Sequence, residues 1–297
     1  SPLIECIIVA RYKDRHGMEA WEISALVEFS EAAAYSSLVS EASRFCAEHG
    51  FSACRLGLAQ VLVAPAVRNT LNLNRVIALG VGEPASEAAL ERVAGIYQEH
   101  GLSYAIEVAP GAQPAELVAW LRARRMRRSV PTAMHYRALD TPLPADASTV
   151  SVVRANSEQY EQVAEICCSV FRMPAAARCL LAAAGSVSGW RHWLAYHGKT
   201  PIAAALSYVA DGVAWLGWDA TLPEYRGHRA QRALIAARID DATAAGCHHA
   251  TTETALHAGA RQDPSYRNYA AMGFVFAYER STYVRAHSLA PVPDATP

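Results

Sequence analysis

The chain has 297 residues with 27 basic and 28 acidic side chains, and this length predicts two domains, each able to bury a core of its own. The balance of charge gives no general field that would hold polyanions, so we expect no nucleic-acid partner. Seven cysteines without a C-x-x-C spacing argue against a metal cluster and against a disulfide framework. No secretory signal and no apolar run of about 18 residues is found, which predicts a cytoplasmic protein without a membrane partner.

A polar, proline-bearing strip at Asp140–Ser148 separates two patterned segments, and we place the domain boundary there. One domain is expected over residues 1–140 and a second over 149–286. Residues 287–297 are small, rich in proline and without periodicity, so their composition predicts a disordered tail.

The first half alternates between strand and helix patterns from Asn74 onward. The expected elements are a strand at 74–82, a helix at 85–99, a strand at 102–108, a helix at 115–125 and a strand at 131–136. The same order returns in the second half, where the interval from Pro223 to Gly246 is longer than the one from Pro84 to Gly101 by the length of one loop. We therefore interpret the first half as a degenerate copy that supports the second and walls its cleft. An unrelated α/β domain is the alternative.

The second half begins with helix patterns and continues as a sheet. The expected elements are a helix with one apolar face around 163–171, a helix at 175–184, strands at 193–196, 202–208 and 213–220, a helix at 231–245, a strand at 248–254, a helix at 264–272 and a strand at 274–285. Turns at Gly198-Lys199 and Asp211-Gly212 predict that the first three strands are antiparallel. The helix between 213–220 and 248–254 predicts a right-handed crossover, and hence a parallel pair.

Two motifs hold fixed places in this order. P-E-Y-R-G-H-R-A-Q, from Pro223, lies between a strand and a helix, and S-Y-R-N-Y-A-A-M-G-F, from Ser265, forms the last helix. Order and motifs together resemble the GNAT family of N-acetyltransferases. The resemblance implies an α/β (α+β) fold with tandem GNAT-like domains, each a mixed, mostly antiparallel sheet flanked by helices. It also implies acetyl-CoA or another acyl-CoA as co-substrate, and no metal.

The loop before the helix at 231–245 suits a pyrophosphate, because free amides and the positive end of the helix dipole meet there. The family pattern has small residues where this chain has Arg229 and Gln231, whose amides still point at the phosphates if both residues adopt right-handed angles in the first helical turn. Basic side chains in and beside the loop add cations for the phosphates. The resemblance implies that the residues binding acyl-CoA are Ala220, Thr221, Arg226, Gly227, His228, Arg229, Ala230, Gln231, Arg232, Ser265 and Asn268.

Tyr269 lies four residues before Gly273, as the family's general acid does, and a phenol there would protonate the departing thiolate. Tyr266 takes its place if the register slips by three. An alkylammonium acceptor must lose a proton before it attacks, and the candidate bases are Glu253 and Asp219. Each carboxylate has a plain alternative, as a solvated strand end or as the partner of a nearby arginine.

Two functions from different classes follow from the sequence. The first is an acyltransferase that moves an acetyl or other acyl group from acyl-CoA to an amine of a small molecule. The alternative is a catalytically inactive protein of the same fold that senses acyl-CoA or binds a partner, which Arg229 and Gln231 favour. The sequence leaves the acceptor open, as well as the choice between monomer and homodimer. Trp190, Trp193, Trp215 and Trp218 indicate either an apolar acceptor pocket or core packing.

Overall fold

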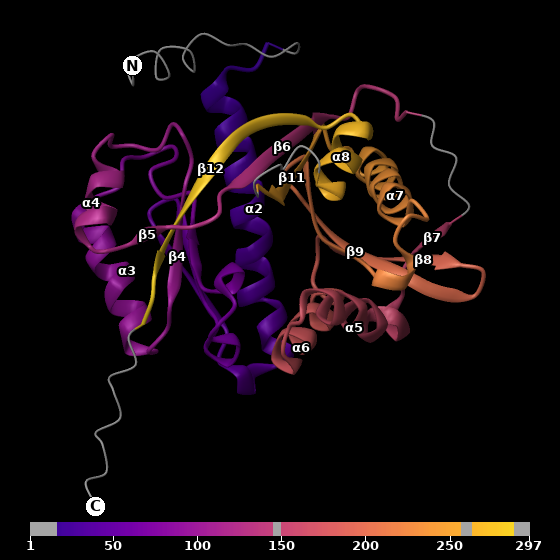
Figure 1. The fold of residues 1–297 in the computed structure, drawn as a ribbon, viewed down its shortest axis with the longest axis horizontal. Coiled ribbons are helices and arrows are strands. Elements are labelled where there is room, and N and C mark those ends of the chain that lie inside the picture. The colour runs from indigo at the N-terminus through magenta and orange to yellow at the C-terminus, as the bar shows by residue number, and fades with distance from the viewer. Residues whose placement is uncertain (1–16, 145–149, 257–262, 288–297) are drawn as a thin grey trace, which may run out of the picture.

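The computed structural model describes residues 17–144, 150–256 and 263–287, so the expected tail from 288 and residues 145–148 of the boundary strip lie outside the described residues. The domain bounds therefore remain a prediction. Within the described residues, twelve strands form one sheet, in the order β1-β2-β3-β4-β12-β6-β11-β10-β9-β8-β7 with β5 beside β12 (Figure 1). No helix among them has the length and apolar character needed to cross a membrane.

The first half begins with a long helix that the apolar pattern does not predict. Its elements are α2 (Ala20–Ser40), the short 3-10 turns η1 (Ala42–Phe45) and η2 (Ala47–His49), β1 (Ser52–Leu56), β2 (Ala59–Val63), β3 (Arg75–Ile77), α3 (Glu87–Glu99), β4 (Tyr104–Val108), α4 (Leu117–Ala123), β5 (Arg127–Arg128) and β6 (Thr132–Ala138). From β3 onward this is the predicted alternation of strand and helix.

From α5 onward the second half follows the predicted order. Its elements are β7 (Ser151–Arg154), α5 (Tyr160–Phe171), α6 (Ala175–Ala184), β8 (Trp190–His197), β9 (Thr200–Ala210), β10 (Val213–Thr221), η6 (Pro223–Tyr225), α7 (Ala230–Ala244), β11 (His249–Ala255), α8 (Pro264–Ala271) and β12 (Val275–Arg285). Strands β8, β9 and β10 are antiparallel, and β10 runs parallel to β11, which confirms both predictions.

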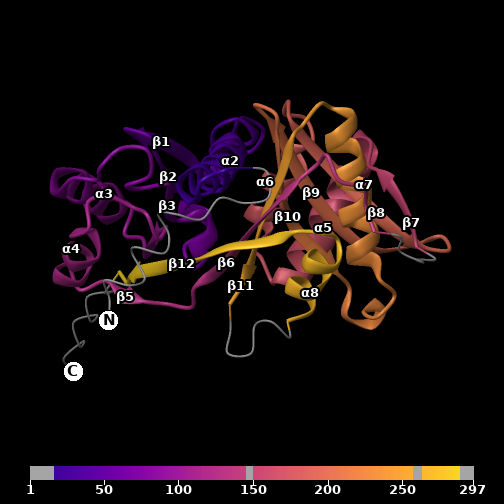
Figure 2. The same ribbon diagram turned by 90° about the horizontal axis from the view of Figure 1, so that it is seen from above.

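Helices cover both faces of the sheet, and the alternation of side chains along each strand decides which layer a residue meets. On one face α2, α5 and α6 share a core that includes Ile77 of β3 and Trp215 of β10. On the other face α3 and α4 pack on the first-half strands, and α7 and α8 pack on those of the second half. Helix α2 lies at the middle of the molecule, where it contacts strands of both halves (Figures 1 and 2).

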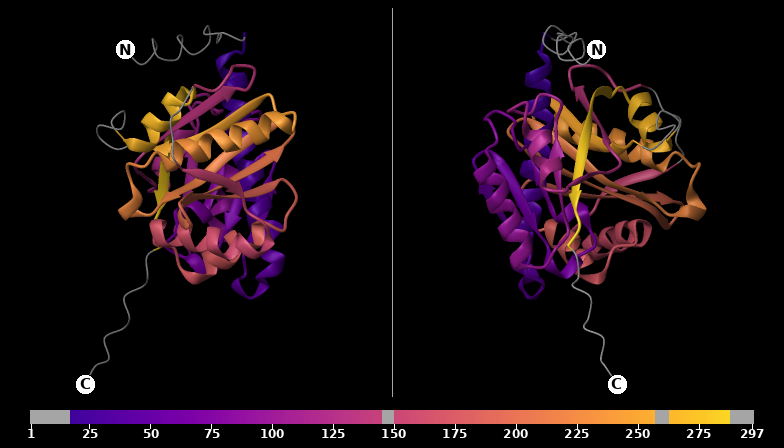
Figure 3. Two further views of the ribbon diagram at one scale, coloured as in Figure 1. Left: turned by 90° about the vertical axis from the view of Figure 1, so that its right-hand side faces the viewer. Right: turned by 60° about the vertical axis from the view of Figure 1, so that its left-hand side comes forward.

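The two halves exchange their last strands. Strand β6 of the first half lies between β11 and the first part of β12, which it pairs from Val275 to Arg280. In return the end of β12, from Ser281 to Arg285, lies between β4 and β5 of the first half. Figures 1 and 3 show β12, in yellow, as one long strand that runs from α8 into the first half. Each half thus completes its sheet with a strand of the other.

A buried ion cluster lies between α2 and strands of both halves. Four carboxylates meet two guanidinium groups there, and all but one of the six side chains are at most 5% exposed. Arg280 reaches Glu253 at 2.5 Å and also contacts Glu31, while Arg75 reaches Glu31 at 2.6 Å. The buried ion cluster consists of Glu28 and Glu31 of α2, Arg75 of β3, Glu107 of β4, Glu253 of β11 and Arg280 of β12.

The excess of carboxylates divides the cluster into groups that ionise readily and groups that do not. Burial raises the pKa of Glu28, and the attraction of Arg280 does not offset it. Burial would raise the pKa of Glu31 as well, but Arg280 and Arg75 outweigh it and lower that pKa to about 2. Glu31 is therefore the most readily ionised of these carboxylates, and it contacts both guanidinium groups, as Glu107 and Glu253 also do.

We predict that Glu31→Gln lowers the free energy of unfolding by about 3–5 kcal/mol at neutral pH, because Arg75 and Arg280 both lose the buried carboxylate whose pKa they lower. Glu28→Gln, one turn earlier on the same helix, should cost clearly less, since burial opposes the charge on Glu28. Denaturant unfolding of both variants measures the difference. An equal loss in the two variants would contradict the assigned roles.

The stability that Glu31 contributes should depend on pH in one direction only. The pKa of Glu31 lies at about 2 in the fold against an ordinary 4.5, so its contribution is complete above pH 4.5 and is lost as the pH falls toward 2. The difference between the wild type and Glu31→Gln should therefore shrink over this window.

Candidate active site

Strands β10 and β11 part after a short parallel pairing. They pair only at Val213, Ala214 and Trp215 of β10, although β10 continues to Thr221 and β11 to Ala255. A register shift between Gly217 and Ala220 interrupts the pairing of β10 with β9, and Trp218 inside it has a left-handed φ of 57°. Such a bulge bends a strand and increases its local twist. The diverging ends of β10 and β11 form the centre of the candidate site.

The predicted backbone contacts lie on this diverging part of β10. Ala220 and Thr221 pair with Ala204 and Ala203 of β9, on the side of the strand away from β11. The edge that faces β11 lies beyond the last β10–β11 pair, so it is placed to accept an extended chain in the manner of an added strand.

The predicted anion loop leads from β10 into α7. Arg226, Gly227, His228 and Arg229 are all exposed, and a side chain added at Gly227 would have no atom within 4 Å. No side chain among the described residues caps the start of α7, which leaves the dipole end of the helix and its first amides to the loop. These features fit the binding of a pyrophosphate group.

The right-handed angles hold for Gln231 but not for Arg229. Arg229 is the residue before α7 and has left-handed angles, with φ of 59° and ψ of 20°, while Gln231 lies inside the helix. Gly227 also has a positive φ, of 92°. The loop thus keeps the backbone path for which a glycine is normally used, and a residue with a Cβ pays a steric cost to follow it. The positive φ of Arg229 could not be predicted from the sequence motif, because arginine normally avoids this conformation.

The starts of α7 and α8 are joined by amide and hydroxyl groups. Gln231 donates to Ser265 Oγ at 2.9 Å and accepts from the Asn268 amide at 2.7 Å, while Arg232 donates to Asn268 Oδ1 at 2.9 Å. Asp263 caps α8 by accepting from the Ser265 amide. Four of the predicted binding residues therefore form one polar network beside the loop.

Tyr269 is buried on α8 and its hydroxyl donates to Asp219 Oδ2 at 2.7 Å. Both carboxylate oxygens of Asp219 are held by Arg238 of α7, which is itself fully buried. Burial raises the pKa of Tyr269, and the neighbouring Asp219 raises it further. Asp219 is thus the partner of an arginine, which is the alternative role that the sequence left open for it. The raised pKa keeps the phenol of Tyr269 protonated.

Glu253 of β11 lies on the face of the sheet opposite to Tyr269 and α8. Its side chain points to the α2 face and belongs to the buried ion cluster, with 17% of the side chain exposed. Thr252, the preceding residue, points to the opposite face and donates to the Leu216 carbonyl of β10 at 2.9 Å. Burial and then Glu31 raise the pKa of Glu253 to about 7, against the effect of the two arginines. A carboxyl with that pKa can exchange a proton near neutrality.

One residue of the site, Arg238, was not found from the sequence. Arg238 stands among the buried apolar residues of α7, and a charge at an apolar position of the helix was the available signal. Tyr266, the alternative to Tyr269, packs instead on the rings of His135 and Phe276. Of the tryptophans, Trp190 and Trp215 lie in the main core, while Trp218 at the bulge contacts Phe171.

A protein-family comparison identifies part of the chain. The model described as "Acetyltransferase (GNAT) family" matches residues 158–274. This range contains the diverging strands, the anion loop and α8. No curated protein matches the chain.

Solved structures match over most of the chain. A GCN5-related N-acetyltransferase from Kribbella flavida has 17% identity and a TM-score of 0.60, with 86% of this chain and 95% of that chain covered. A tandem GNAT protein from the clavulanic acid biosynthesis pathway has 16% identity and a TM-score of 0.58, with 90% and 95% covered. A GCN5-related N-acetyltransferase from Sphaerobacter thermophilus has 13% identity and a TM-score of 0.56, with 89% and 93% covered. At such identities the likeness shows the fold, and it confirms the expected tandem architecture.

Proposed function

Residues 158–274 form a domain of the acetyltransferase (GNAT) family, and from this premise we propose that the protein transfers an acetyl or other acyl group from acyl-CoA to an amine of a small molecule. The divergence of β10 and β11 directly before an uncapped helix start carries this proposal. The free edge of β10, the first amides of α7 and the buried phenol of Tyr269 support it together. Fold alone would not support the assignment, because folds of one kind serve many functions.

The loop and the strand edge together account for the binding of acyl-CoA. The amides from Gly227 to the first turn of α7 meet the pyrophosphate, and Arg226, Arg229 and Arg232 add positive charge around it. The pantetheine arm then follows the edge of β10 at Ala220 and Thr221. Ser265 and Asn268 flank it from α8, where the network with Gln231 fixes their orientation.

Bound acyl-CoA supplies a thioester, whose acyl carbon the amine attacks while the thiolate departs. Tyr269 holds the proton that the thiolate takes up, and its raised pKa keeps the phenol protonated until then. Asp219 stays paired with Arg238 when the hydroxyl turns from it toward the sulfur, so its carboxylate keeps a partner. A thiolate in a dry site is itself a stronger base than in water, which favours the transfer.

Glu253 is the base that we propose for the acceptor ammonium, because burial and Glu31 raise its pKa to about 7 although Arg280 and Arg75 contact it. Side chains alternate along β11, so Glu253 and Thr252 point to opposite faces of the sheet. Tyr269 lies on the α8 side, and the acceptor therefore approaches from the α2 side. Glu253 is bound by Arg280, so the first half and the exchanged strands hold the base in place.

Kinetics of Tyr269→Phe test the role of the phenol. Turnover with an amine found by screening should fall by about 10²-fold or more, the usual contribution of a general acid, while acetyl-CoA affinity changes little. Tyr266→Phe, one turn earlier on α8, is the matched control and should keep its rate. Equal losses of turnover and affinity in Tyr269→Phe, or a larger loss of turnover in Tyr266→Phe, would contradict the assignment of Tyr269 as the general acid.

The pH profile tests the role of Glu253. A base must be deprotonated to act, so kcat/KM of the wild type should rise with pH through about 7, where Glu253 ionises. In Glu253→Gln this limb should vanish and the rate should fall at every pH. If kcat/KM of the variant still rises through about pH 7, the base is a group other than Glu253.

A further inference from the structure

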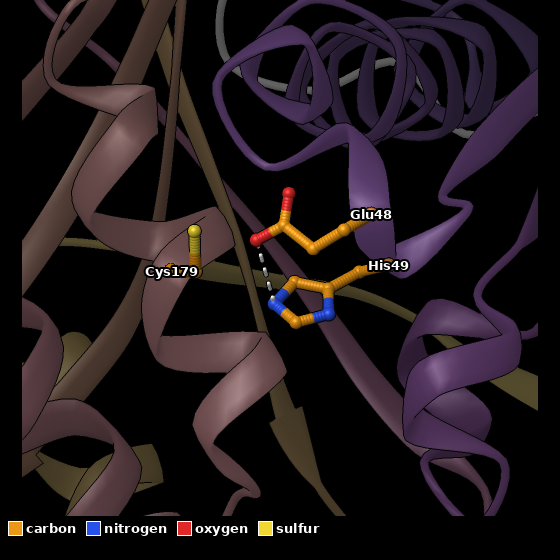
Figure 4. A group of neighbouring side chains, drawn as sticks. All are labelled: Glu48, His49 and Cys179. Carbon is orange, nitrogen blue, oxygen red and sulfur yellow. Dashed lines mark ion pairs between the residues drawn. The ribbon is translucent and has the colours of Figure 1, made fainter.

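Glu48, His49 and Cys179 converge at the place where the first half meets α6. The carboxylate and the imidazole extend from η2, and the thiol faces them from α6 (Figure 4). One ligand atom of each residue lies within 4.8 Å of the other two. His49 Nε2 and Glu48 Oε1 are 3.6 Å apart. Two ligands of one tetrahedral zinc ion are expected at roughly 3.3–3.8 Å, given bonds of about 2.0–2.3 Å. The existing spacing therefore needs only a small adjustment.

From this geometry we propose that Glu48, His49 and Cys179 form a binding site for a divalent transition-metal ion of the zinc type. Nitrogen, sulfur and a carboxylate oxygen are the ligands that zinc takes in proteins, with water at a fourth position. Calcium and magnesium prefer sites made of oxygen alone, so the ligand set argues against them.

The surroundings hold these three donors in place. The His49 ring packs edge-on against Phe51, with ring centroids 5.8 Å apart, which restricts its rotation. Cys179 lies inside the helix α6, whose position is fixed by contacts with η1 and α2. Glu48 is the most exposed of the three, with 69% of its side chain accessible, so the ion can enter from solvent.

A second thiol lies beside the site and defines the rival explanation. Cys46 is fully buried, whereas Cys179 is only half-buried. The Cys46 Sγ donates to the Ala42 carbonyl at 3.8 Å. Cys179 is thus the sulfur open to a cation. If the two thiols are instead a redox pair, oxidation joins them in a disulfide, and the metal site does not exist.

A bound ion would link η2 of the first half to α6 of the second. It would add a further connection between the halves, beside the contacts that α6 already makes with η1 and α2. An ion that binds only the folded protein stabilises it by mass action, so saturating Zn²⁺ should raise the melting temperature. This site lies on elements other than β10, β11, α7 and α8, and its test uses no enzymatic activity. Its failure would leave the proposed acyl transfer untouched.

The test is a Co²⁺ titration of the full chain, reduced and freed of metal with a chelator. The wild type should bind one equivalent with the near-ultraviolet band of a sulfur-to-cobalt bond, and Zn²⁺ should displace it. Cys179→Ser should lose the band, and both this variant and His49→Gln should bind at least about tenfold more weakly. Cys54→Ser, an exposed cysteine on β1, is the control and should bind as the wild type does.

Alkylation followed by mass mapping gives a second readout. Saturating Zn²⁺ should protect Cys179 from the reagent and leave Cys54 reactive. Three results would overturn the proposal: Co²⁺ binding in Cys179→Ser equal to the wild type, no saturable binding at all, or a Cys46–Cys179 disulfide that forms equally fast with and without Zn²⁺ under mild oxidation.

Discussion

The buried ion cluster is the interaction on which the rest of the structure depends. Arg75 comes from the first half and Arg280 from the last strand of the chain, and Glu31 of α2 binds both. Pairs of this kind are costly to bury and even more costly to break. The cluster therefore joins α2 to β3, β4, β11 and β12 through contacts that pair each arginine with several carboxylates.

The candidate active site depends on this junction through Glu253. Its carboxylate is held at 2.5 Å by Arg280, and its pKa is raised because burial and Glu31 disfavour a further negative charge. The exchanged strand β6 pairs with β11 along the whole length of β11, so a strand of the first half supports the strand that carries Glu253. In this account the first half contributes to catalysis by shaping the base, although it carries none of the proposed residues for acyl-CoA.

Local patterns predicted the second half well, because each of its elements has a clear period or a clear end. Helix α6 begins and ends where the pattern places it, and the crossover gave the parallel pair. Helix α2 escaped prediction because its buried face carries Glu28, Glu31 and Ser24 where apolar residues were sought. The strand exchange and the pairing of Asp219 with Arg238 join residues far apart in the chain, and no local pattern encodes such partners.

Calorimetric titration with acetyl-CoA tests the central claim most directly. The account predicts saturable binding at one site, lost in Gly227→Pro, because proline removes an amide and cannot adopt the φ of 92° found there. Arg229→Gly keeps the left-handed turn and should still bind, more weakly by the loss of one cation. No binding by the wild type, or undiminished binding by Gly227→Pro, would contradict the claim and favour a protein that has kept the fold for another role.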